Sequence, residues 1–195
     1  MSQQESRSLD EQRAEFKRRR FLAMPLAGCI VWALVAIAGA LLKPFAAVMV
    51  LFIGTGSIFY LAIVISRFTG EHLLDKKRPK NTFDNLFLSV MAMALMVFAI
   101  AIPFFLRDYT SLPLTVGILT GLMWIPFSWI IEHWVGLMHS VSRTLLIVAA
   151  WYLFPDQRFV VIPLLIVAVY LFTIFILEQR WREVNNAQRT VQPTA

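Results

Sequence analysis

Six long runs of apolar residues determine what this chain can fold into. Each run is close to the roughly 20 apolar residues that a helix needs to cross a bilayer core about 30 Å thick. The runs stay apolar along their length, whereas the strands of a membrane β-barrel alternate between apolar and polar residues. The sequence therefore predicts an all-α polytopic membrane protein, a bundle of six transmembrane helices.

The balance of residue types points the same way. Hydrophobic residues make up 58% of the chain and charged residues 15%, whereas soluble domains have about 45–50% and about 25%. We expect a cytoplasmic N-terminal arm (1–20), a transmembrane domain (21–177) and a cytoplasmic C-terminal tail (178–195). The predicted spans are residues 21–42, 45–66, 85–106, 112–131, 136–154 and 159–177.

The N-terminal arm carries a helix-start signal. Ser8 is followed three residues later by Glu11, which is the pattern of a capping box. A short helix with Leu9 and Phe16 on one side is expected to follow. Because two apolar residues make a weakly amphipathic helix, the arm is expected to be a solvated tail, with a membrane-surface arm as the alternative.

Lysine and arginine are distributed unevenly between the two ends of the predicted bundle. Of the 18 in the chain, only Lys43, Arg107 and Arg158 fall in loops at the end opposite the termini. Basic residues in short loops stay in the cytoplasm. Both termini are therefore expected on the cytoplasmic side.

The net charge of +6 also bears on partners. Because the basic residues cluster beside apolar runs, anionic lipid headgroups of the bilayer are the expected counter-charge, and no nucleic acid is expected. A homodimer is a candidate assembly for a chain of this size. The residues expected to contact headgroups are Arg18, Arg19, Arg20, Lys76, Lys77, Arg78 and Lys80.

The fourth and fifth runs carry ionisable residues within an otherwise apolar stretch. A tight hairpin is expected to bring Glu132 near His139 and Arg143 at the cytoplasmic end of these spans. One interpretation is a packing groove closed by a Glu132–Arg143 ion pair; the other is a carboxylate–imidazole relay or an anion site at a cavity mouth. The candidate polar cluster consists of Ser128, Glu132, His133, His139 and Arg143.

Small residues and a proline are expected to shape the packing of the spans. Pro126 cannot donate to the carbonyl of Leu122, which is then free for Ser128, water or a ligand. Glycine lets another backbone approach closely, the more so in a small-xxx-small pair. The glycines expected to serve helix packing are Gly54, Gly56, Gly117 and Gly121.

No catalytic residue, cofactor or metal site is predicted. The two-histidine helix-turn spacing of a zinc site is missing, and Cys29 is the single cysteine. There is no Gly-x-Ser-x-Gly elbow, P-loop or dinucleotide fingerprint. A membrane-embedded enzyme is therefore the least favoured class, although the sequence leaves enzyme activity undecided.

Short motifs resemble those of a family of small bacterial multi-pass membrane proteins, catalogued as a domain of unknown function. They are a charged N-terminal helix ending at Phe16 and Lys17, the stretch Ile30–Ala33 (IVWA), and the stretch Ile125–Trp129 (IPFSW). The resemblance covers most of residues 9–177, but the basic loop 67–84 is not matched. It implies a six-helix protein of the bacterial inner membrane and supplies no activity.

Two functions therefore remain open from the sequence. The first is a small transporter or channel-like protein, with Glu132, His139 and Arg143 lining a cytoplasmic vestibule. The second is a non-catalytic membrane scaffold that binds a partner or lipid. A transporter is expected to keep Glu132 in a water-filled cavity, whereas a scaffold is expected to hold it in an ion pair or at the surface.

Overall fold

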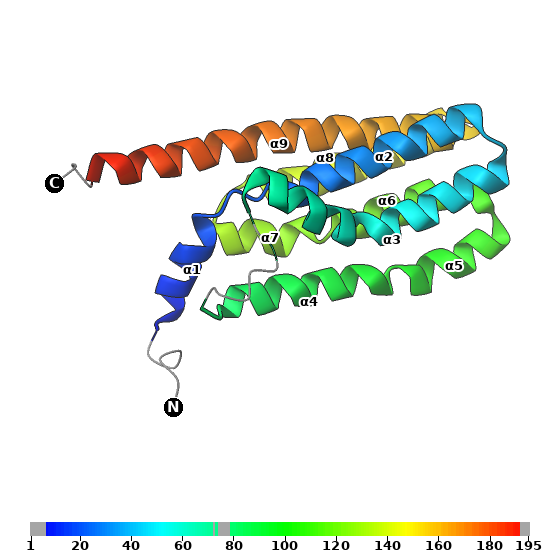
Figure 1. The fold of residues 1–195 in the computed structure, drawn as a ribbon. Coiled ribbons are helices and arrows are strands. Elements are labelled where there is room, and N and C mark those ends of the chain that lie inside the picture. Colours follow the sequence, from blue (N-terminus) through cyan, green and yellow to red (C-terminus); the bar gives the residue numbers. More distant parts are fainter. Residues whose placement is uncertain (1–6, 72, 74–78, 192–195) are drawn as a thin grey trace.

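Long helices running side by side make up the structure, a computed structural model that describes residues 7–71, 73 and 79–191, with side chains through residue 186. The described residues form helices and loops without a strand, which confirms the all-α class. α1 (Leu9–Lys17) lies across one end of the bundle, and the C-terminal part of α9 extends beyond that same end (Figure 1).

The bundle itself consists of helices and two short 3₁₀ turns. The turns are η1 (Tyr109–Ser111) and η2 (Pro155–Gln157). The helices are α2 (Ala23–Leu41), α3 (Pro44–Thr69), α4 (Thr82–Met96), α5 (Phe98–Arg107), α6 (Leu112–Gly121), α7 (Trp124–Ile131), α8 (Val135–Leu153) and α9 (Arg158–Val191).

Five segments among the described residues are long and apolar enough to cross a membrane. They are Ala23–Leu41, Pro44–Thr69, Thr82–Arg107, Tyr109–Ile131 and Pro155–Asn186. They coincide with five of the six predicted spans. α8, which covers the remaining prediction, is absent from this set although it has 19 residues. Its apolar character is reduced by His139 and Arg143, together with several hydroxyl side chains.

The break between α6 and α7 follows from Pro126. Proline has no N–H to donate to the residue four positions earlier, so the α-helical ladder is interrupted at Leu122. The carbonyl of Leu122 instead accepts a tighter bond from the N–H of Ile125, at 3.1 Å. The expectation that this carbonyl is free for Ser128 or a ligand is therefore wrong. Ser128 donates to the carbonyl of His133 instead.

α2 is the central helix of the bundle and packs along α3 and α9. Trp32 and Val35 of α2, Leu51 of α3, and Ile162 and Ile166 of α9 are all fully buried. Burial of such side chains gives close packing between helices, which drives helix association where lipid is as apolar as the protein. The core therefore lies along α2.

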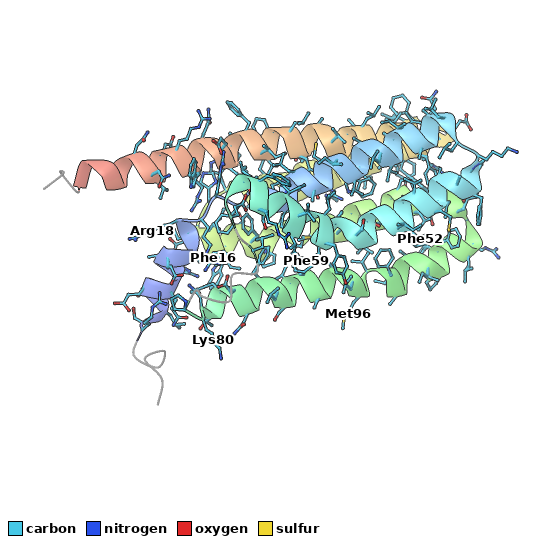
Figure 2. The ribbon with its side chains drawn as sticks, in the orientation of Figure 1. Phe16, Arg18, Phe52, Phe59, Lys80 and Met96 are labelled. Carbon is cyan, nitrogen blue, oxygen red and sulfur yellow. The ribbon has the colours of Figure 1, made fainter. Side chains whose placement is uncertain are left out.

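The outer faces of the helices remain apolar. Leu41, Phe68 and Tyr152 are each at least 77% exposed. A soluble protein rarely exposes so many large apolar side chains, whereas hydrocarbon is the matching solvent for them. In Figure 2, Phe52 and Met96 lie along this apolar length, while Arg18 and Lys80 lie near the end that carries α1.

α1 is part of the fold and not a solvated tail. Its capping box is confirmed, since the Ser8 hydroxyl accepts from the N–H of Glu11 and the Glu11 carboxylate accepts from the N–H of Ser8. Phe16 is 1% exposed and packs against the rings of Phe83 and Phe87 at the start of α4. Phe16 thus anchors α1 against α4. The expectation that the arm is a solvated tail is therefore wrong.

Gly39→Ala tests the contact between α2 and the beginning of α9. A Cβ at Gly39 would overlap the backbone carbonyl of Phe159, which cannot rotate away. Overpacking of this kind costs about 1–3 kcal/mol, so the melting temperature in detergent should fall by several degrees. Gly56→Ala is the matched control, because a Cβ there meets nothing within 4 Å. An equal response of both variants would contradict the close contact.

Candidate functional site

The predicted polar cluster divides into a surface part and an interior part. His139 and Arg143 are 0% and 1% exposed within the bundle, whereas the side chain of Glu132 is 49% exposed. Glu132 ends α7 in the left-handed conformation, with φ of 50°. This conformation is uncommon for a residue with a side chain. The expected Glu132–Arg143 ion pair is wrong, because Glu132 pairs with residues of α1.

Ion pairs fasten α1 and the residues directly after it to the start of α4, the end of α7 and the C-terminal half of α9. Glu132 accepts from Lys17 and, at 3.0 Å, from Nη1 of Arg13. Arg19 bonds both carboxylate oxygens of Asp84 at the start of α4. Arg20 bonds both carboxylate oxygens of Glu178 in α9, at 2.9 and 3.1 Å. We call this set the α1 clasp; it comprises Arg13, Lys17, Arg19, Arg20, Asp84, Glu132 and Glu178.

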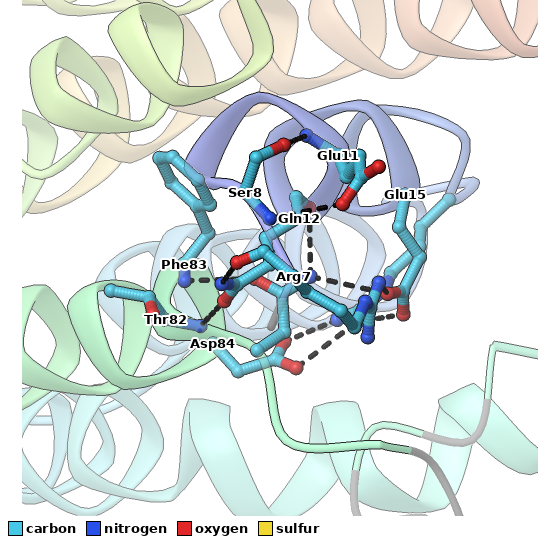
Figure 3. A network of polar contacts seen from close by, with 10 residues as sticks. Arg7, Ser8, Glu11, Gln12, Glu15, Thr82, Phe83 and Asp84 are labelled. Atoms are coloured by element: carbon cyan, nitrogen blue, oxygen red, sulfur yellow. Dashed lines mark hydrogen bonds and ion pairs between the residues drawn. The ribbon is translucent and has the colours of Figure 1, made fainter. Parts of the chain in front are cut away.

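Buried polar groups support the clasp beneath the ion pairs. Gln12 accepts from the N–H of Thr82 at 2.8 Å, and its backbone carbonyl accepts from the Asn81 amide at 2.7 Å (Figure 3). Glu71 accepts from the N–H groups of Leu22 and Ala23, at 2.9 and 2.8 Å. These bonds satisfy donors at helix starts, which would otherwise lack partners. Buried hydrogen bonds therefore hold the clasp together in addition to its ion pairs.

The residues predicted to contact headgroups have different surroundings. Arg19 and Arg20 are held in the clasp, whereas Arg18 and Lys80 are exposed at the same end of the bundle. Lys76, Lys77 and Arg78 lie outside the described residues.

Arg143 is surrounded by neutral polar groups from three helices. Its Nη2 donates to the hydroxyl of Thr120 in α6 at 3.0 Å. Its Nη1 donates to the hydroxyl of Tyr170 in α9 at 3.3 Å, and lies 3.5 Å from Nε2 of His139. We call Thr120, His139, Arg143, Tyr170 and Thr173 the Arg143 cluster.

The hydrogen-bond chain determines which nitrogen of His139 carries a proton. The hydroxyl of Thr173 donates its only proton to the carbonyl of Val169, at 2.8 Å. It can therefore only accept from Nδ1 of His139, also at 2.8 Å. The neutral ring then presents the lone pair of Nε2 to Arg143. His139 thus serves as an acceptor for the guanidinium.

Aromatic rings enclose the Arg143 cluster. Trp124 stacks on His139 with 4.3 Å between ring centroids. The guanidinium carbon of Arg143 lies 5.4 Å from the ring centroids of both Trp32 and Tyr170. This distance is within the range of cation–π attraction. The guanidinium is therefore sealed from lipid by aromatic surfaces.

The glycines singled out from the sequence differ in their contacts. A Cβ at Gly121 would lie 3.0 Å from Cδ of Arg143, and one at Gly117 would lie 2.9 Å from Ile147. A Cβ at Gly54 would lie 3.0 Å from Val31 of α2. Gly56 faces open space, so its expected packing role is wrong.

A pocket of about 430 Å³ lies at the end of the bundle that carries the clasp. Its wall is largely apolar and includes Phe59 of α3 with Phe87 and Leu88 of α4. The charged groups of the lining are two basic and two acidic residues, Arg19, Lys80, Glu71 and Asp84. No sequence motif indicated it, because its lining comes from helices far apart in the chain.

Trp124 separates this pocket from the Arg143 cluster. It lines the pocket and also stacks on His139. His133 and Ser128, by contrast, hold the turn between α7 and α8, since Nδ1 of His133 accepts from the N–H of Val135 at 3.2 Å. Among the described residues, no three His, Cys, Asp or Glu side chains come together as a metal-binding group.

The chain belongs to a family of unknown function, DUF7010, whose model matches residues 9–180. The match includes the α1 clasp, the pocket and the Arg143 cluster, and it confirms the resemblance to an uncharacterised domain. No curated protein and no solved structure matches the chain.

Glu132→Gln tests the clasp. The hydrogen bond from Lys17 holds the pKa of Glu132 below its ordinary value, and Arg13 lowers it further. A depressed carboxylate pKa stabilises the docked state above the pKa of the free glutamate, and this stabilisation is lost as pH falls through the lower docked value. At pH 7 the variant should therefore exchange the backbone amides of α1 about two- to fivefold faster, as measured by hydrogen–deuterium exchange.

The difference between Glu132→Gln and the native chain should shrink in high salt and at acidic pH. Asp156→Asn is the matched control, because this exposed carboxylate lies in η2 at the other end of the bundle. Unchanged exchange in Glu132→Gln at pH 7 and low salt would refute the clasp.

Proposed function

We propose that this chain is a six-span protein of the bacterial plasma membrane that binds an anionic phospholipid from the cytoplasmic leaflet. The observation that carries the proposal is the pocket beside the α1 clasp. Its volume of about 430 Å³ lies within the range of small-molecule sites, about 300–1,000 Å³. The proposal develops the lipid-binding alternative predicted from the sequence.

The two kinds of lining residue match the two parts of a phospholipid. Phe59, Phe87 and Leu88 offer an apolar wall to an acyl chain. Lys80 also lines the pocket, and Arg18, outside the lining, is exposed at the same end (Figure 2). Each basic residue near an anionic surface contributes about 1 kcal/mol of attraction. The surface position of Glu132 supports binding over a proton relay, because its carboxylate is neutralised by two cations.

α8 supports the count of six spans. Its 19 residues extend about 28 Å, close to the bilayer core of about 30 Å. Leu137, Val141 and Leu145 recur every four residues and are about half-exposed or more, whereas His139 and Arg143 face inward. A helix whose polar side chains are satisfied inside the bundle presents an apolar face to lipid. Six spans place both termini on one side, and the basic loops make that side cytoplasmic.

A small transporter or channel-like protein is the second candidate. The observation that favours it is the burial of His139 and Arg143 inside the bundle, because ionisable residues within spans mark substrate or ion pathways. Flux of protons and small anions into proteoliposomes containing the native chain distinguishes this function from lipid binding alone.

Cysteine labelling tests whether α8 crosses the membrane. In a Cys29→Ala background, His133→Cys and Gln157→Cys place single thiols at the two ends of α8. With six spans, a membrane-impermeant maleimide added to intact cells should label position 157 and leave position 133 unlabelled. Labelling of both positions, or of neither until the cells are opened, would contradict the sixth span.

Leu88→Trp tests the lipid pocket. Leu88 lines the pocket, so a tryptophan there should fill it and reduce the retained phosphatidylglycerol at least severalfold, measured by native mass spectrometry after detergent extraction. Leu86→Trp is the matched control, because Leu86 is also exposed on α4 but is not part of the lining. Equal retention in both variants, or retention of phosphatidylcholine at the same level, would overturn the proposal.

A further inference from the structure

Arg143 has no acidic partner within the part of the chain that the structure describes. Its polar neighbours are Thr120, Tyr170 and the acceptor nitrogen of His139, all of which are neutral. An ion pair needs a carboxylate oxygen within 4.0 Å of the guanidinium. None of the described carboxylates lies that close to Arg143. A buried guanidinium keeps its charge at any ordinary pH. The Arg143 cluster therefore carries a positive charge that the described residues do not neutralise.

The cluster also has more hydrogen-bond donors than acceptors. A guanidinium has five N–H groups, and three hydrogen bonds involve those of Arg143. Its Nε is buried without a partner, and so are the indole nitrogens of Trp32 and Trp124. Both tryptophans pack on the cluster, Trp32 against Arg143 and Trp124 against His139. Buried polar groups are normally paired, and the described residues supply no acceptor to these three donors.

The cluster lies well inside the membrane-spanning part of the bundle. Arg143 is eight residues after the start of α8 at Val135, which is about 12 Å along the helix. Tyr170 is eight residues before Glu178, whose carboxylate pairs with Arg20 in the clasp. A phosphate group at the membrane surface therefore does not reach the cluster. The missing acceptor must be small enough to enter between helices.

We propose that the Arg143 cluster is a binding site for one small monovalent anion of the chloride class. One unneutralised guanidinium supplies one positive charge, which matches a monovalent ion. The unpaired N–H donors of Arg143, Trp32 and Trp124 suit an anion, which can accept from them. Gly121 lets the backbone of α6 pack directly against the stem of Arg143, because any Cβ there would press on its Cδ. The site is independent of lipid binding in the neighbouring pocket.

The pocket gives the anion an approach from the cytoplasmic end. Trp124 is the wall shared by the pocket and the cluster. Movement of this one side chain connects the pocket lining with His139, which bonds the guanidinium.

Thermal unfolding of the purified chain in nanodiscs tests the site, with sodium chloride compared with sodium gluconate at equal ionic strength. Gluconate is too large for a site enclosed by Trp32, Trp124 and Tyr170. A ligand that binds only the folded state shifts the folding equilibrium about elevenfold at ten times its dissociation constant. The melting temperature of the native chain should therefore rise with chloride and saturate, and Arg143→Met should lose this dependence.

Arg158→Met is the matched control, because Arg158 is also largely covered but sits at the opposite end, near Asp108 and Trp151. It should keep the full response to chloride. Arg143→Lys retains the charge without the guanidinium fork, so it should respond only at about tenfold higher chloride.

Three results would overturn the proposal. They are a native chain that melts at the same temperature in both salts, an unchanged chloride response in Arg143→Met, and an unchanged response in Arg143→Lys if the methionine variant does not fold. The pocket variant Leu88→Trp should keep its chloride response, because the rise in melting temperature reports equilibrium occupancy of the Arg143 cluster and not the route of entry. Failure of lipid binding and failure of anion binding are therefore distinguishable.

Discussion

A hydrocarbon interior provides no water to hydrogen-bond a polar side chain, and this constraint governs how the bundle is put together. α8 carries an arginine and a histidine into the interior of the bundle, so neighbouring helices must supply the surrounding groups. Thr120 of α6 and Tyr170 of α9 bond the guanidinium, and Trp32 of α2 covers it. Four helices therefore meet at one side chain. The same arrangement keeps the outer face of α8 apolar.

The fold could be predicted from the sequence where the length of an apolar run, compared with the thickness of a bilayer, decides the structure. Runs of about 20 apolar residues have few alternatives to a spanning helix, and five of the expected segments meet that criterion. The Ser8–Glu11 capping box is similarly a local pattern. The docking of α1 was not predictable, because Phe16 is held by Phe83 and Phe87, which lie more than 60 residues later. Tertiary contacts of this kind leave no periodic signal in the arm itself.

The candidate site shows the same division between local and distant information. His139 and Arg143 share a helix face, as their spacing of four predicts, and they are found together. A left-handed backbone conformation at the end of α7 separates Glu132 from them. The sequence around Glu132 does not specify this conformation. Tyr170 and Thr173 complete the surroundings of Arg143 from a helix whose composition is otherwise apolar. The pocket could not be predicted from the sequence, because its lining residues become neighbours only through the fold.

The α1 clasp also imposes an order on how the chain matures. Arg20 and Glu178 are 158 residues apart, and a ribosome adds about 5–20 residues per second. Synthesis therefore takes roughly 8–32 seconds to reach the last partner of the clasp after Arg20 has been added. During this time Arg13 and Lys17 cannot yet pair with Glu132, and Arg20 cannot yet pair with Glu178. These contacts, which secure α1, therefore form only after most of the bundle has been synthesised.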